Sequence, residues 1–78
     1  MRIEFTTASR KHRIGRAHVR YVMASQDPEE IVTTRGERGW RYVGPDDRGL
    51  KLDIIAVELD GGDLLVIHAM PTALRGDG

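Results

Sequence analysis

The sequence contains no cysteine, only four aromatic residues and no apolar run of membrane-spanning length. The lack of cysteine excludes a disulfide framework and a thiolate zinc site, and it is typical of proteins of the reducing cytoplasm. A membrane helix needs roughly 18 apolar residues, and the N-terminus lacks the charged-then-apolar order of a secretion signal. We therefore expect a cytoplasmic protein without a membrane partner.

The length of the chain limits the number of domains, because 78 residues make one small domain. We expect this domain to span residues 1–75, with residues 76–78 as a flexible tail. A chain this short buries only roughly 60–65 % of the surface that its unfolded form exposes. A partner subunit would therefore add useful stability.

Net charge is also absent, since twelve Lys and Arg balance twelve Asp and Glu. Residues 1–41 nevertheless carry nine basic and five acidic side chains, whereas residues 42–78 carry three and seven. Residues 10–21 hold five of the bases and no acid. Such a segment suits a polyanionic partner, either a nucleic acid or an acidic protein surface. The alternative is a solvated helix face that the acidic half of the same fold balances.

The pattern of residues predicts one strand, a helical region and then a series of strands. Residues 2–6 alternate polar and apolar side chains, as in a short strand. Residues 8–14 predict one or two helical turns, Gly15 interrupts them, and residues 16–25 resume the helix. Pro28 ends the helical region. Strands are predicted at residues 31–35, 40–43, 50–59 and 64–69.

This order predicts an α+β fold in which one or two N-terminal helices pack on an antiparallel meander sheet of three or four strands. The strand at 50–59 becomes apolar on both faces, so we expect it to be central. Trp40 and Tyr42 point to one face of their strand, where they are either core residues or a stacking surface for bases. In the helix, one apolar stripe and one basic face are expected. The apolar stripe consists of Ala17, Tyr21 and Ala24 with Ile14, and the basic face of Arg13, Arg16 and Arg20. Val19, Val22 and Met23 lie on other sides, so the helix is apolar over more than half its circumference.

Three short strings resemble motifs of one family of small bacterial proteins. They are Arg-Lys-His-Arg-Ile at residues 10–14, Trp-Arg-Tyr-Val-Gly at 40–44 followed by Arg48-Gly49, and Val-Ile-His-Ala-Met-Pro at 66–71. In this order, they resemble the BrnT-type toxins of the RelE and ParE superfamily, in a compact variant of actinobacterial type. Met70 stands where the larger family carries an arginine.

The resemblance implies a small RelE-like domain that acts as the toxin of a type II toxin–antitoxin system. Such a toxin is a metal-independent ribonuclease (an mRNA interferase), and a cognate antitoxin protein neutralises it by masking its site. The implied partners are RNA and the antitoxin, and operator DNA is bound only through the antitoxin complex. No cofactor is implied.

Cleavage of RNA without a metal needs a base for the ribose 2′-OH, an acid for the leaving 5′-oxygen and cations around the phosphorane. His68 and His12 are the candidate acid and base, because histidine titrates near neutral pH. Arg41 and Arg48 are candidates to hold the scissile phosphate through their guanidinium forks. Each also has a plainer interpretation, as a satisfied strand or surface histidine or as an exposed hairpin arginine.

Other cations of the basic segment suit the RNA backbone, or an acidic segment of the antitoxin, better than catalysis. These candidate binding residues are Lys11, Arg13, Arg16 and Arg20. The three histidines lack the spacing of a helical zinc site, so no metal is expected. Residues 60–63 (Asp-Gly-Gly-Asp) predict a turn, since two carboxylates repel phosphate.

Two functions besides the nuclease stay open at this point. The first is a non-catalytic RNA- or protein-binding module of the same fold, and the second is an orphan structural domain. Met70 in place of the arginine favours the module. His68 as a substitute acid or base favours the enzyme.

Overall fold

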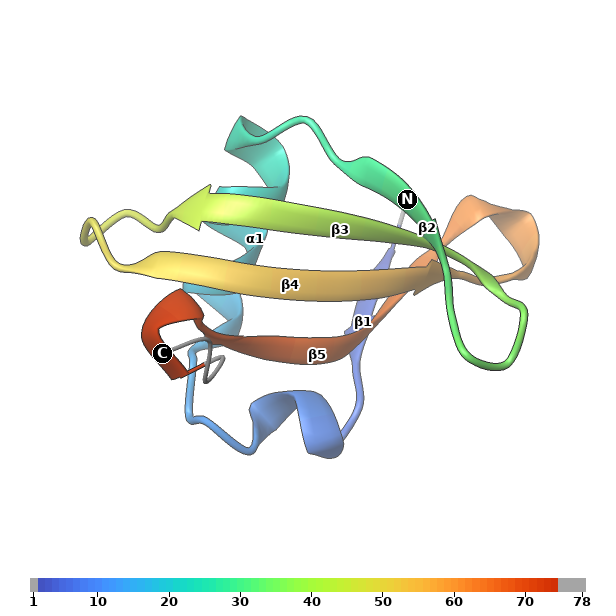
Figure 1. Cartoon of the computed structure of the whole chain (residues 1–78), viewed down its shortest axis with the longest axis horizontal. Coiled ribbons are helices and arrows are strands. Elements are labelled where there is room, and N and C mark those ends of the chain that lie inside the picture. Colours follow the sequence, from blue (N-terminus) through green and yellow to red (C-terminus); the bar gives the residue numbers. More distant parts are fainter. Residues whose placement is uncertain (1, 75–78) are drawn as a thin grey trace.

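One α-helix covers one face of a five-stranded sheet in the computed structural model, which describes residues 2–74 (Figure 1). The helix is α1 (Arg16–Ser25). The strands are β1 (Ile3–Phe5), β2 (Glu29–Val32), β3 (Arg38–Pro45), β4 (Lys51–Glu58) and β5 (Leu64–Pro71). Three short 3-10 turns complete the fold: η1 (Ala8–Arg10), η2 (Asp60–Gly62) and η3 (Thr72–Leu74). The predicted tail at 76–78 lies outside the described residues.

The fold is α+β as predicted, but the sheet is mixed and has five strands, so the predicted antiparallel meander of three or four strands is wrong. Strands β2 to β5 do form an antiparallel meander. β1 adds a fifth strand, because it pairs in parallel with the free edge of β5, with Ile3 opposite Leu64. Arg2 N–H also donates a hydrogen bond to the Asp63 carboxylate (2.9 Å), 61 positions later.

The helix has the predicted bounds, whereas the helical structure before it is shorter than predicted. Gly15 is extended (ψ 145°) and forms the N-cap of α1, and Gln26 is extended after the last turn. Upstream, the Thr6 hydroxyl accepts a hydrogen bond from Ser9 N–H (3.1 Å), which supports the single 3-10 turn η1. Arg13 has a φ of 59° and therefore lies outside any helix. Within the described residues, no helix has the length and apolarity needed to cross a membrane.

Of the apolar sides that the sequence predicts for the helix, the side that carries the valines is buried. Val19 and Val22 are 1 % and 0 % exposed and belong to the core. In the predicted stripe, Ile14 packs against the core, whereas the two alanines and the tyrosine are exposed. Two valines remove more apolar surface from water than two alanines, and the exposed tyrosine keeps its hydroxyl in solvent, so this rotation of the helix is favoured. The exposed residues of the stripe are Ala17, Tyr21 and Ala24.

β4 is the central strand, as its two apolar faces predicted. Its side chains toward α1, Leu52, Ile54 and Ala56, are fully buried. Tyr42 of β3 is buried in the same core, and Trp40 packs against it. The interpretation of this aromatic pair as core residues is therefore confirmed.

Where α1 ends, the chain passes close to β3 at Gly44. A Cβ atom at position 44 would lie 2.4 Å from Cδ of Gln26, so glycine allows this approach. The position of α1 across the sheet therefore depends in part on a residue that has no side chain.

The strand predicted at residues 31–35 begins and ends earlier, at Glu29 and Val32. A tight turn starts at Thr33, whose hydroxyl accepts a hydrogen bond from Glu37 N–H (3.1 Å). Gly36 N–H donates to the Thr33 carbonyl (2.8 Å), and Gly36 has a φ of 81°. This turn removes both threonines of the predicted strand from the sheet.

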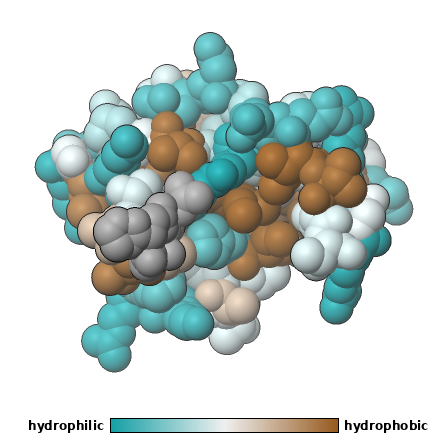
Figure 2. All heavy atoms as spheres, viewed as in Figure 1, coloured by the Kyte–Doolittle hydropathy of each residue, from teal (hydrophilic) through white to brown (hydrophobic). Residues whose placement is uncertain are grey.

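The face of the sheet opposite α1 is turned toward the reader in Figure 1. Figure 2 shows apolar side chains gathered on this face, with polar side chains around them. An open cleft of about 560 Å³ lies here. Its apolar lining consists of Ile31, Val32, Ile55, Met70 and Leu74.

Substitution of two valines tests this division of the sheet into a face covered by α1 and an open face. Val22→Ala is expected to lower the free energy of unfolding by about 2 kcal/mol, because two methyl groups leave a filled core. Val32→Ala is the matched control, since Val32 is 74 % exposed, and it should cost less than about 0.5 kcal/mol. Urea unfolding of both variants measures the difference. Equal losses would contradict the core described here.

Candidate functional site

Five arginines gather beside the first turn of α1. One hollow of about 290 Å³ is lined by Arg10, Arg13, Ile14, Gly15 and Arg16. A second hollow of about 370 Å³ is lined by Arg2, Arg10, Arg16 and Arg20 together with Ile3, Glu4 and Phe5. The hollows are neighbours because they share Arg10 and Arg16, and Glu4 is the single acidic residue among the described residues that line them. We name Arg2, Arg10, Arg13, Arg16 and Arg20 the arginine surface.

Two of these arginines lie over the ring of Phe5. The guanidinium carbons of Arg16 and Arg20 are 6.0 and 5.9 Å from the ring centroid. An aromatic face attracts a cation through its quadrupole, so the ring favours two like charges side by side. β1 supplies the ring and α1 supplies the arginines, so this part of the surface depends on the pairing of β1 with β5.

Three of the four predicted binding residues belong to the arginine surface: Arg13, Arg16 and Arg20. Lys11 is exposed in the turn after η1. Sequence reasoning missed Arg2, because its place depends on a parallel strand pairing that the sequence does not reveal. Arg10 did have a signal, since it belongs to the segment that contains no acid.

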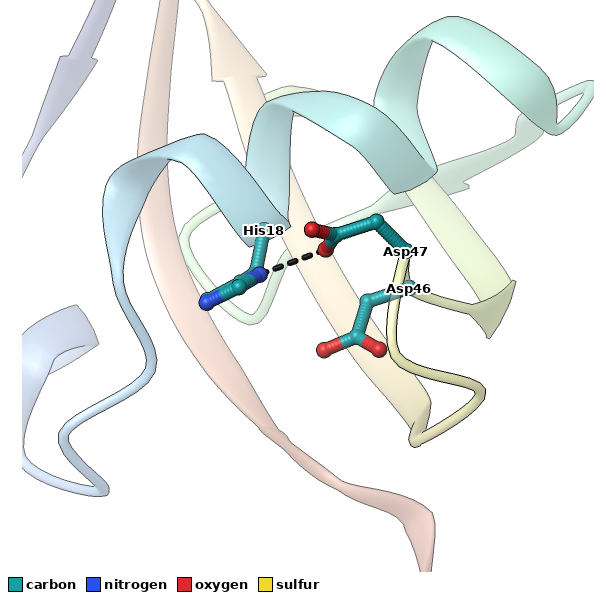
Figure 3. Close-up of side chains that lie close together, drawn as sticks. All are labelled: His18, Asp46 and Asp47. Carbon is teal, nitrogen blue, oxygen red and sulfur yellow. Dashed lines mark hydrogen bonds and ion pairs between the residues drawn. The ribbon is translucent and has the colours of Figure 1, made fainter.

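A histidine that sequence reasoning did not select ties α1 to the turn between β3 and β4 (Figure 3). His18 Nδ1–H donates a hydrogen bond of 2.5 Å to Asp47 Oδ1. The two side chains are 27 % and 46 % exposed, so solutes can reach the pair. The second ring nitrogen points away from both carboxylates in Figure 3. With Nδ1 as the donor, Nε2 of the neutral ring is an acceptor.

Asp46 is buried (3 % exposed) and organises the same turn. Its Oδ1 accepts hydrogen bonds from Arg48 N–H (2.8 Å) and Leu50 N–H (3.0 Å), and its Oδ2 accepts from Arg48 Nε (3.1 Å) and Nη2 (2.7 Å). Burial alone would raise the pKa of Asp46, but these hydrogen bonds and the charge of Arg48 outweigh it and lower that pKa below its ordinary value. The predicted phosphate ligand Arg48 is therefore engaged by Asp46.

His18, Asp46 and Asp47 offer ligand atoms within 4.8 Å of one another. Hydrogen bonds account for this arrangement, because both oxygens of Asp46 accept bonds from Arg48 and Asp47 accepts the bond from His18. The guanidinium of Arg48 would also repel a cation. We therefore infer no metal site from this cluster.

Arg41 and His68, both predicted to be catalytic, line the cleft on the open face of the sheet. The strand register places Ile55 between them, in one row across β3, β4 and β5. Arg41 Nε and Nη2 donate to the two carboxylate oxygens of Asp53 at 3.0 and 2.9 Å. The Asp53 side chain is only 4 % exposed, and a buried carboxylate needs such a partner. The guanidinium group of Arg41 thus links β3 to β4 through Asp53.

The four predicted catalytic residues lie in three different places. Arg41 and His68 line the cleft, Arg48 lies in the β3–β4 turn, and His12 is half-buried between η1 and α1. Neither Arg48 nor His12 is among the residues that line the cleft. The catalytic roles of these four residues stay predictions.

Fold and sites together define a small α+β protein with a mixed sheet and an arginine-rich surface. No protein-family model matches the chain, and no curated protein or solved structure matches it. The resemblance to the BrnT-type toxins therefore rests on the three sequence strings and the order of elements that the sequence predicts.

The lowered pKa of Asp46 makes its contribution to stability dependent on pH. The ionised carboxylate stabilises the fold above its ordinary pKa near 3.8, and this stabilisation is lost as the pH falls through the lower pKa of the folded state. Asp46→Asn is therefore expected to unfold at a lower urea concentration than the wild type at pH 7, and the difference should shrink at pH 3.

The exposed Asp27→Asn is the matched control and should behave like the wild type at both pH values. A difference between wild type and Asp46→Asn that stays constant from pH 7 to pH 3 would show that the ionised form of Asp46 does not stabilise the turn.

Proposed function

We propose that this protein is a toxin-type ribonuclease that binds RNA through the arginine surface. The observation that carries RNA binding is the convergence of five arginines on two neighbouring hollows. Each guanidinium can donate two parallel hydrogen bonds to a phosphate group. Because a polynucleotide offers phosphates along its whole length, several arginines can engage the same strand.

Four acidic side chains elsewhere in the fold are paired with basic residues outside this surface. Asp46 is paired with Arg48, Asp47 with His18, and Asp53 with Arg41. Glu30 of β2 is paired with Arg38 of β3. The zero net charge of the chain gives no long-range attraction, so binding depends on the local cluster of arginines.

The nuclease part of the proposal rests on the resemblance to BrnT-type toxins and on accessible histidines near cations. Such a toxin would cleave RNA without a metal or cofactor, and an antitoxin with an acidic segment would neutralise it by covering the arginine surface. A non-catalytic RNA-binding module is the alternative that uses the same surface. Cleavage of RNA by the purified protein separates the two.

RNA binding by this surface predicts a particular response to salt. For single strands, each phosphate contact contributes about 0.7 to the slope of the logarithm of affinity against the logarithm of salt concentration. The double variant Arg16→Gln/Arg20→Gln should therefore bind a fluorescent 2′-O-methyl oligoribonucleotide more weakly, with a slope reduced by about 1.4. Fluorescence polarisation between 50 and about 200 mM salt measures it.

Arg38→Gln is the matched control, because Arg38 is exposed at the far end of β3 and lies outside the arginine surface. It should leave both affinity and slope close to those of the wild type. An equal loss in this variant would mean that binding is spread over the whole molecule, and an unchanged slope in the double variant would exclude the arginine surface as the RNA site.

Toxicity is expected if RNA cleavage accompanies binding. Expression of the wild type alone in bacteria should arrest growth, and expression of Arg16→Gln/Arg20→Gln should not, because its RNA affinity is reduced. Colony counts after induction, with immunoblots for equal protein levels, measure this. Normal growth in the presence of folded wild-type protein would contradict the toxin proposal and leave RNA binding in place.

A further inference from the structure

We propose that His18, oriented by Asp47, is the general base of RNA cleavage, with the scissile phosphate held by the arginines that line the neighbouring hollow. This assignment rests on the proposed function and adds to it a catalytic residue that the sequence motifs do not indicate. It moves the reaction centre from the open sheet face to the first turns of α1.

The geometry of the pair is that of an oriented base. Asp47 accepts the Nδ1–H of His18 at 2.5 Å, which fixes the ring orientation and its tautomer. Nε2 is left as an acceptor and points away from both carboxylates (Figure 3). A carboxylate in this position also stabilises the imidazolium that forms when Nε2 takes up a proton.

The ring of His18 packs beside Gly15, which is one of the residues that line the hollow. A Cβ atom built on Gly15 would lie 3.2 Å from Cδ2 and 3.8 Å from Nε2 of His18, so the absence of a side chain at Gly15 leaves room for the ring. Gly15 itself lines the hollow together with Arg10, Arg13 and Arg16. A phosphate bound by these arginines would therefore have Gly15 as a neighbour, as the ring has, and we infer that the ribose next to it reaches Nε2.

Arg48 is linked to this cluster through Asp46. Asp46 offers an oxygen within 4.8 Å of the ligand atoms of His18 and Asp47, and Nε and Nη2 of Arg48 both donate to Asp46, at 3.1 and 2.7 Å. Arg48 therefore orders the turn that carries Asp47 and supplies no free fork to the phosphate.

The proposed reaction is an internal transfer. Nε2 of His18 takes the proton from the ribose 2′-OH while the 2′-oxygen forms a bond to phosphorus. The bond from phosphorus to the 5′-oxygen breaks, and the leaving 5′-oxygen takes a proton from water. The products are a 2′,3′-cyclic phosphate and a 5′-hydroxyl, and the hydroxide left from water is neutralised by the proton on His18. The arginines stabilise the charge of the phosphorane.

His68 is less well placed for this role. It lies in the cleft with Arg41, whose two donors serve the buried carboxylate of Asp53. Phosphate binding there would have to compete with an ion pair between neighbouring strands, and loss of that pair would leave a buried charge without its partner.

Steady-state cleavage of a mixed-sequence RNA by His18→Ala tests the assignment. Removal of a general base is expected to lower kcat on the order of 10²- to 10⁴-fold. Free imidazole should restore part of the activity, because it can enter the space that the ring has left. Binding of an uncleavable 2′-O-methyl oligoribonucleotide should stay within about twofold of the wild type, since His18 is not one of the residues that line the arginine surface.

Asp47 is tested as a positioning residue. Asp47→Asn should lower kcat and leave KM unchanged, because it loosens the ring without touching the arginines. Asp60→Asn in the exposed η2 turn is the matched carboxylate control and should leave kcat as in the wild type.

The possible outcomes are distinct. Full cleavage by His18→Ala, or its loss in His68→Ala alone, overturns the assignment. Lost cleavage that imidazole does not restore, together with lost RNA binding, also overturns it, because the ring would then only shape the surface. If the wild type binds RNA but does not cleave it, the role of His18 as general base is refuted and RNA binding is not. If the wild type does not bind RNA, both the role of His18 and RNA binding by the arginine surface are refuted.

Discussion

The packing of α1 on a single face of the sheet is the constraint on which the rest of this structure depends. Val19 and Val22 of the helix are buried with Leu52 and Ile54 of the central strand, and these four side chains belong to a core cluster of nine buried residues among those described. A domain of this size buries little apolar surface, so few rotations of the helix on the sheet bury both valines. The rotation that buries them then decides which side chains of α1 are exposed to solvent.

Two functional features follow from that rotation. The arginines at the start of α1 extend over Phe5 toward β1 and form the arginine surface. His18 is turned toward the β3–β4 turn, where Asp47 receives its Nδ1–H. Both features begin on the same two turns of helix, and Gly15, which lines the basic hollow, also lies beside the ring of His18. The open face of the sheet, by contrast, is mainly apolar, and its cleft contains an ion pair that serves the sheet.

The helix and the strands could be predicted from local sequence signals, whereas the position of the site residues depends on contacts between residues far apart in the sequence. Gly15 and Pro28 marked the limits of the helical region, and the two apolar faces of residues 50–59 marked the central strand, because both signals depend on nearby residues. The parallel pairing of β1 with β5, which places Arg2, has no such signal. The hydrogen bond from His18 to Asp47 spans 29 positions, and it depends on how the helix is rotated on the sheet. Periodicity alone likewise does not say which apolar side of the helix is buried, and the structure buries Val19 and Val22 while Tyr21 is exposed.

The most direct test of this account is an NMR titration of the protein with an uncleavable single-stranded 2′-O-methyl oligoribonucleotide. We expect chemical-shift changes on the amides of residues 10–20 and on the imidazole ring of His18, and unchanged signals for Ile55 and His68 on the open face. Shifts confined to the open face, with the arginine surface unaffected, would contradict this account.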